Sequence, residues 1–197
     1  MGVLLLGALL SAGCAPPFVD VAAVYDTGRH EVVVVGSTSS GLGTWTWDGI
    51  HWSLVSSEMP ANTAPGTSAF CFDRSNHSIL SFGGWGSGVP INGDTWNWDA
   101  AKWNQVHPLH SPSPRFGAVL LCSNHPVLFG GFGGQLGPWL TDTWEWNGAD
   151  WTQLHPAHGP GTSASFAVFD GRRDLIFLAT NPSQTWTWTG TDWVRLA

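Results

Sequence analysis

Residues 142–151, DTWEWNGADW, carry three tryptophans in ten positions. The arrangement, Trp-x-Trp with a third Trp five residues later, occurs four times, and the closing tryptophans stand 51, 48 and 42 residues apart. Twelve of the fourteen tryptophans belong to these copies, so the chain is built from an internal repeat. The copies are TWTWDGIHW (44–52), TWNWDAAKW (95–103), TWEWNGADW (143–151) and TWTWTGTDW (185–193).

Each copy follows two apolar runs separated by a short polar segment, as in GAVLLC (117–122) and PVLFGG (126–131). Alternate residues of a strand share a face, so Trp144 and Trp146 should point to the same side. The NGAD link then turns the chain into a last strand that begins at Trp151. No segment shows sustained helical periodicity. The repeat therefore predicts four antiparallel strands per unit.

A four-stranded meander of about 40 to 50 residues cannot bury both faces alone, whereas like units stacked around an axis can. Broad indole rings fill the wedge between neighbouring units, so we assign the repeated tryptophans to packing rather than to ligand binding. We predict an all-β propeller of four four-stranded antiparallel blades. The predicted blades are 18–58, 59–109, 110–156 and 157–197.

Paired glycines followed by DTWNW or DTWEW and a closing Trp resemble kelch repeats, in the form found in exported bacterial proteins and in the central domain of galactose oxidase-like chains. The resemblance covers residues 18–197. It is specific in the second and third units and weaker in the outer ones. Kelch propellers usually have six or seven blades, whereas this chain supplies four. Three arrangements of the four blades are therefore compatible with the sequence: a closed ring, an open arc and part of a longer product. The glycine pairs are Gly83-Gly84 and Gly130-Gly131, replaced by Gly36-Ser37 and Ala179-Thr180 in the outer units.

The opening MGVLLLGALLSAGCAPP is apolar but too short for a membrane-spanning helix, which favours an export signal over residues 1–14, ahead of a propeller over 15–197. Residues 10–14 resemble a bacterial lipoprotein cleavage box, which implies lipidation at Cys14 and a location in the cell envelope or outside the cell. Ser11 departs from the box, and no basic residue precedes Arg29. The alternative is a buried first strand. A bridge between Cys71 and Cys122 is possible but not implied.

The amino-acid composition restricts the classes of partner that the protein is expected to bind. Only 11% of residues are charged, against about 25% in typical soluble domains, and the net charge is -7. No cluster of Lys and Arg is present to follow a phosphate backbone, so nucleic acid is not an expected partner. A membrane is expected only through the lipid anchor.

The residue inventory argues against an enzyme. The resemblance raises a galactose oxidase-like site, which needs two tyrosines, but Tyr25 is the only one. A sialidase-like site needs three arginines, and of the six present only Arg115 stands at the start of an inner strand. The aspartates fall in turns, where they bond their own backbone, and no pair of carboxylates is placed for acid-base chemistry. We expect no cofactor. The alternatives are a structural fragment of a larger propeller protein, or an enzyme of these two types that has lost its site.

Loops between the second and third strands should share a face with the linkers between blades, and the resemblance implies that partners dock there. Trp85 and Trp139 are the two tryptophans outside the repeat, and both fall in glycine-rich segments of this face. With Phe132 and Arg115 they form the predicted site for a glycan or a protein. The alternative is that each Trp covers its own blade.

Two linkers, HPLH and HPAH, repeat a pair of histidines. Neutral imidazole is a good zinc or copper ligand, but equivalent points of adjacent blades are usually more than about 10 Å apart, too far for one shared ion. We therefore predict no metal site. The alternative role of the linkers is a bend set by Pro108 and Pro156. The histidines, kept as candidate ligand-binding residues, are His107, His110, His155 and His158.

Overall fold

The computed structural model describes residues 16–39, 41–60, 63–86, 88–122, 125–134, 139–161, 164–170, 175–180 and 184–196. The whole predicted export signal, residues 1–14 including Cys14, lies outside these ranges. The described residues form sixteen strands and no helix, in four antiparallel sheets of four consecutive strands each. The predicted fold class, an all-β propeller of four four-stranded blades, is confirmed. No helix in the described segments is long and apolar enough to cross a membrane.

Each sheet lies within one predicted blade. Blade 1 contains β1 (Val19–Asp26), β2 (Glu31–Thr38), β3 (Gly41–Trp47) and β4 (Trp52–Ser56). Blade 2 contains β5 (Ala69–Asp73), β6 (Ser78–Gly86), β7 (Val89–Trp98) and β8 (Trp103–Val106). Blade 3 contains β9 (Val119–Cys122), β10 (Pro126–Phe129), β11 (Thr143–Trp146) and β12 (Trp151–Leu154). Blade 4 contains β13 (Ala164–Asp170), β14 (Leu175–Thr180), β15 (Gln184–Trp188) and β16 (Trp193–Leu196).

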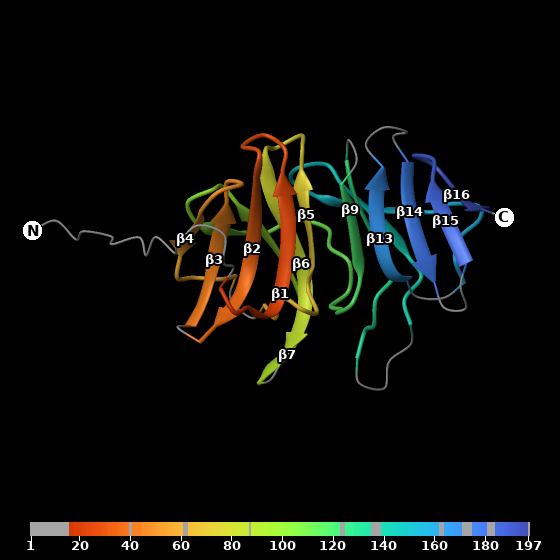
Figure 1. Ribbon diagram of the computed structural model, residues 1–197. Helices are drawn as coiled ribbons and strands as arrows, with labels where there is room; N and C mark the ends of the chain where they lie inside the picture. The colour runs from red at the N-terminus through yellow and green to blue at the C-terminus, as the bar shows by residue number, and fades with distance from the viewer. Residues whose placement is uncertain are drawn as a thin grey trace, which may run out of the picture.

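The four blades form an open arc. The inner strands pack in the order β1, β5, β9, β13, and no packing of comparable extent joins β13 to β1 in the described part of the chain. Figure 1 shows blade 1 and blade 4 at opposite ends of the arc, with the inner strands side by side between them. The structure therefore argues against the closed ring, while the open arc and the part of a longer product both agree with it.

The spacing of the repeat reflects a cross-strand pair of tryptophans. The second Trp of each Trp-x-Trp lies opposite the closing Trp, as Trp146 lies opposite Trp151 across the NGAD turn. Ring centroids in the four pairs are 5.0 to 5.4 Å apart. All twelve repeat tryptophans are buried or half-buried, which agrees with a packing role. The pairs are Trp47–Trp52, Trp98–Trp103, Trp146–Trp151 and Trp188–Trp193.

A hydrogen bond joins each of blades 2, 3 and 4 to the blade before it. The closing Trp donates its indole N–H to the hydroxyl of the first Thr in the preceding Thr-Trp-x-Trp segment, at 2.9 or 3.0 Å. The acceptor threonines are at most 1% exposed. Buried indole N–H groups need a partner, so this contact both satisfies the ring and fixes the spacing of the blades. The three bonds are Trp103 to Thr44, Trp151 to Thr95 and Trp193 to Thr143.

Aspartates close several turns as the sequence predicted. The Asp26 carboxylate accepts the backbone N–H groups of Gly28 and Arg29, and Asp73 accepts the N–H of Ser75. Asp48 does the same in the turn between β3 and β4, where it accepts the N–H of Ile50. These side chains satisfy donors that the turn leaves free.

A disulfide joins Cys71 of β5 to Cys122 of β9, with the two Cα atoms 5.7 Å apart. It links the inner strands of blades 2 and 3, across a sequence separation of 51 residues. The pairing that the sequence left open is therefore present, and it ties together two repeats rather than two strands of one repeat.

Candidate functional site

Four aromatic rings form a continuous row on the face where blades 2 and 3 meet. Trp85 lies 5.3 Å from Phe116, Phe116 lies 5.4 Å from Phe132, and Phe132 lies 4.9 Å from Trp139, measured between ring centroids. Trp85 is 37% exposed and Trp139 is 61% exposed, while the two phenylalanines are half-buried. We call this row, Trp85, Phe116, Phe132 and Trp139, the aromatic ladder. The structure thus brings together three of the residues predicted from the sequence.

Trp85 does not lie on a loop, as the sequence suggested, but in β6. Strands β6 and β7 continue past the core to Gly86 and Val89, with irregular register near Gly84. In Figure 1 the end of β7 reaches beyond the body of its blade. Gly83 and Gly84 have positive φ values of 67° and 128°. A Cβ there would collide with the Arg115 carbonyl or the Ser68 side chain, so the glycine pair lets the next linker approach this hairpin.

Backbone hydrogen bonds hold the ladder in place. Phe116 and Phe132 exchange two N–H to carbonyl bonds of 3.1 and 2.9 Å, which pair the linker before β9 with the segment after β10. Gly84 donates to the Arg115 carbonyl at 2.8 Å, and Leu140 donates to the Gly131 carbonyl at 2.9 Å. The main chain beneath the rings is therefore fixed before any ligand arrives, which reduces the ordering cost of binding.

Sequence reasoning missed Phe116. Its position beside Arg115 at the start of the third unit is visible in the sequence, but its neighbours Trp85 and Phe132 belong to segments that only the fold brings together. An aromatic residue at a blade entrance, next to two glycine-rich segments that carry aromatics, is the signal that could have found it.

Arg115, predicted to bind a ligand, has a structural role instead. Its side chain is 1% exposed. All five guanidinium N–H donors have acceptors, which are supplied by Ser113, Gly130 and Asp142. Burial raises the pKa of Asp142, but the hydrogen bonds from Arg115 and Trp144 outweigh burial and hold this pKa below its ordinary value. Arg115 has no donor left for a ligand, so it is removed from the predicted site.

The histidine linkers also differ from expectation. His110 donates its backbone N–H to Asp150, and its Nδ1 lies 2.7 Å from the same carboxylate; His158 and Asp192 repeat this arrangement. The hydrogen bonds from the His110 side chain and backbone hold the pKa of Asp150 below its ordinary value. In an untwisted blade the linkers and these turns would lie on opposite faces, because antiparallel strands alternate in direction. Each step between strands adds about 20–25° of twist, which carries the outer turn toward the preceding linker.

Asp150 and Asp192 lie in turns, as predicted, but their carboxylates also accept hydrogen bonds from the preceding linker. Asn147 and Thr189 close these two turns by accepting the N–H groups of Asp150 and Asp192. His107 and His155 are exposed. No group of three or more His, Cys, Asp or Glu residues that could hold a metal occurs in the described segments.

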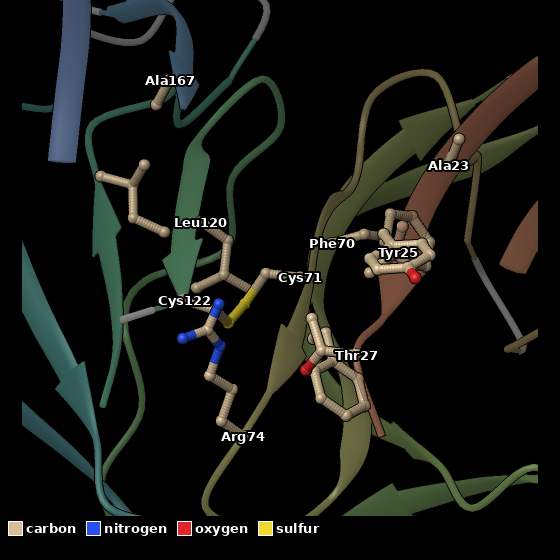
Figure 2. A pocket seen from close by; sticks show the side chains of 12 residues that line it. Ala23, Tyr25, Thr27, Phe70, Cys71, Arg74, Leu120, Cys122 and Ala167 are labelled. Carbon is tan, nitrogen blue, oxygen red and sulfur yellow. A yellow bond between two sulfur atoms is a disulfide. The ribbon is translucent and has the colours of Figure 1, made fainter. Parts of the chain in front are cut away.

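The concave side of the arc holds a cavity of about 400 Å³ along the inner strands. Tyr25, Phe70, Arg74 and the Cys71–Cys122 disulfide lie along its walls (Figure 2). Tyr25 is 51% exposed. None of the residues predicted to bind a ligand lines this cavity. The cavity has a mixed polar and apolar lining without a paired acid and base, so it is a weaker candidate than the aromatic ladder.

Comparison with known proteins agrees with the fold. No protein-family model matches the chain, and no curated protein matches it. Among solved structures, one titled "Structure of YjhT" superposes with a TM-score of 0.68 at 15% sequence identity, over 95% of this chain and 67% of that chain. Similarity at this level of identity shows the shared fold and carries no function.

Proposed function

We propose that the chain is a non-enzymatic binding module of an exported protein, and that it recognises a glycan or a protein through the aromatic ladder. The observation that carries the proposal is the row of four contacting rings whose two end tryptophans are exposed. Exposed tryptophans with adjacent polar main chain stack on sugar rings or anchor peptide side chains. A fixed row of several rings favours the extended repeating surface of a glycan.

Two further parts of the proposal rest on separate observations. A disulfide between buried inner strands is typical of proteins that fold in oxidising compartments, which supports export and the predicted signal at residues 1–14. The positive φ angles of Gly83, Gly84, Gly130 and Gly131 support repeats of the kelch type, because only glycine adopts them without strain. The absence of a catalytic role follows from the residue inventory and stays a proposal.

Binding to a glycan array and to proteins from envelope extracts tests the ladder. The double variant Trp85→Ala/Trp139→Ala should weaken binding by at least about 10-fold, the loss expected for an anchoring residue. Tyr25→Ala is the matched control, since Tyr25 is an exposed aromatic on the concave side. If the double variant still bound the ligand, or if the control lost binding, the binding site would lie on another surface of the protein. Array binding identifies a glycan, and extract binding without array binding identifies a protein.

The structural-fragment alternative has a specific observation of its own, the open arc. It makes the opposite prediction for the same experiment: neither assay detects a ligand for the unmodified chain. Turnover of an oxidisable alcohol or a sialoside would instead contradict the non-enzymatic part of the proposal.

A further inference from the structure

The two ends of the arc differ in how their outer faces are covered. The contacts between neighbouring blades inside the arc show what such a face normally binds. At each of the three internal boundaries, the closing Trp of one blade donates its indole N–H to a buried Thr of the preceding blade. At two of them a Phe of the preceding blade also packs edge-on against that Trp, with Phe82 5.4 Å from Trp151 and Phe129 5.2 Å from Trp193. At the ends of the arc only one partner of these contacts is present: the closing Trp in blade 1, and the Thr in blade 4.

The blade 1 end is covered by the chain itself. Phe18, just before β1, lies 5.3 Å from Trp52 and 5.9 Å from Trp45. It therefore occupies the place that a phenylalanine of a preceding blade takes at Trp151 and Trp193. Trp45 is only 5% exposed although no other described blade packs against this side of blade 1. Terminal repeats need such a cover, because their outer face otherwise exposes the apolar surface that an internal repeat buries.

The blade 4 end has no equivalent cover in the part of the chain that is described. Thr185 pairs with Leu196 and Ala179 in the sheet, the position at which Thr95 pairs with Val106 and Phe82. The three internal threonines at this position are 0 to 1% exposed, whereas Thr185 is exposed. The Thr185 hydroxyl thus corresponds to the acceptor of the hydrogen bond between blades, and no indole N–H among the described residues donates to it.

We propose that the outer face of blade 4, centred on Thr185, is a docking surface for a further four-stranded β-meander that supplies an indole N–H. A second copy of this chain fits the surface poorly. Its closing tryptophans in blades 2 to 4 are already bonded to threonines, and Trp52 lies under Phe18. The YjhT chain extends beyond the 67% that superposes on these four blades, so a similar fold accommodates further chain.

Extending the chain tests the docking surface. A second copy of residues 155–197 is appended after Ala197, so that the natural linker and its closing Trp follow blade 4. The added blade should resist limited proteolysis. Thr185→Val, which removes the hydroxyl acceptor and keeps the shape, should lower the Tm of the extended chain by about 2–4 °C and leave the Tm of the original chain within about 1 °C.

A double-mutant cycle separates docking from a general effect of the added segment. The second substitution replaces the Trp of the added copy that corresponds to Trp193 by Phe, and the reference cycle is Thr143→Val with Trp193→Phe at an internal boundary. We expect the two cycles to show coupling of the same sign and similar size. Proteolytic removal of the added blade, or additive effects of Thr185→Val and the Trp→Phe change, would overturn the proposal.

Discussion

Arg115 and Asp142 show at the scale of single residues how the chain holds the aromatic ladder in place. Two carboxylate oxygens of Asp142 accept guanidinium N–H groups at 2.6 and 2.9 Å, and the same carboxylate accepts the Trp144 indole N–H at 2.7 Å. Arg115 also donates to the Gly130 carbonyl at 3.0 Å. A buried guanidinium is tolerated because it is paired and fully hydrogen-bonded. The ion pair therefore connects the linker before β9 to both ends of the segment that carries Phe132 and Trp139.

Asp142→Asn should destabilise the protein by about 3 kcal/mol at pH 7, because it leaves the Arg115 charge buried without its counter-ion. The pKa of Asp142 is lowered in the folded state, so its contribution is complete above the unfolded value of about 3.9 and is lost as pH falls through the lower folded pKa. Urea unfolding from pH 7 to pH 3 should show the difference from the original protein narrowing below about pH 4. Glu58→Gln, at an exposed position, is the control. A difference that stays constant with pH would contradict this account.

At the scale of the element, the Trp to Thr bond is the connection between neighbouring sheets. Thr95→Val should lower the free energy of unfolding by about 1–2 kcal/mol, because the N–H of Trp151, a ring that is 1% exposed, then lacks an acceptor. Thr152→Val, at an exposed position of β12, is the matched control and should change stability by less than about 0.5 kcal/mol. Equal effects of the two substitutions in urea titrations would show that the bond contributes nothing.

Strand periodicity explains why the elements were predictable and some contacts were not. Trp-x-Trp fixes the face of a strand, and the four-residue turn fixes the pairing of Trp146 with Trp151, so both follow from local sequence. The Thr95 acceptor of Trp151 lies 56 residues away in another sheet, and no local pattern indicates it. The same limit applies to the ladder: Trp85, Phe132 and Trp139 were found as unusual exposed aromatics, while Phe116 and the burial of Arg115 depend on packing between blades.

For the whole molecule, the Cys71–Cys122 disulfide joins two blades that also share a buried cluster including Leu80, Leu128 and Trp146. Constraining a loop of this length in the unfolded chain stabilises a protein by about 4 kcal/mol in the chain-entropy model. We expect Cys71→Ala/Cys122→Ala to lose about 2–4 kcal/mol in urea unfolding. Dithiothreitol should destabilise the original protein to a similar extent and leave the double variant unchanged. An unchanged midpoint in the double variant would mean that packing alone fixes this boundary.

The open arc predicts the dimensions of the protein in solution. A compact chain of about 180 residues has a radius of gyration near 16 Å. The arc leaves inner-strand side chains such as Val21 and Tyr25 exposed at 43% and 51%, where a closed ring would cover them. Small-angle scattering of residues 15–197 should therefore give a radius of gyration of about 18 Å or more, with the mass of a monomer near that of the 21.1 kDa full chain.

A radius of gyration near 16 Å would mean that the two ends of the arc meet. Blade 4 could reach blade 1 only if every pair of neighbouring blades packed at a tighter angle. Twice the monomer mass would mean that the arc binds a second copy of itself.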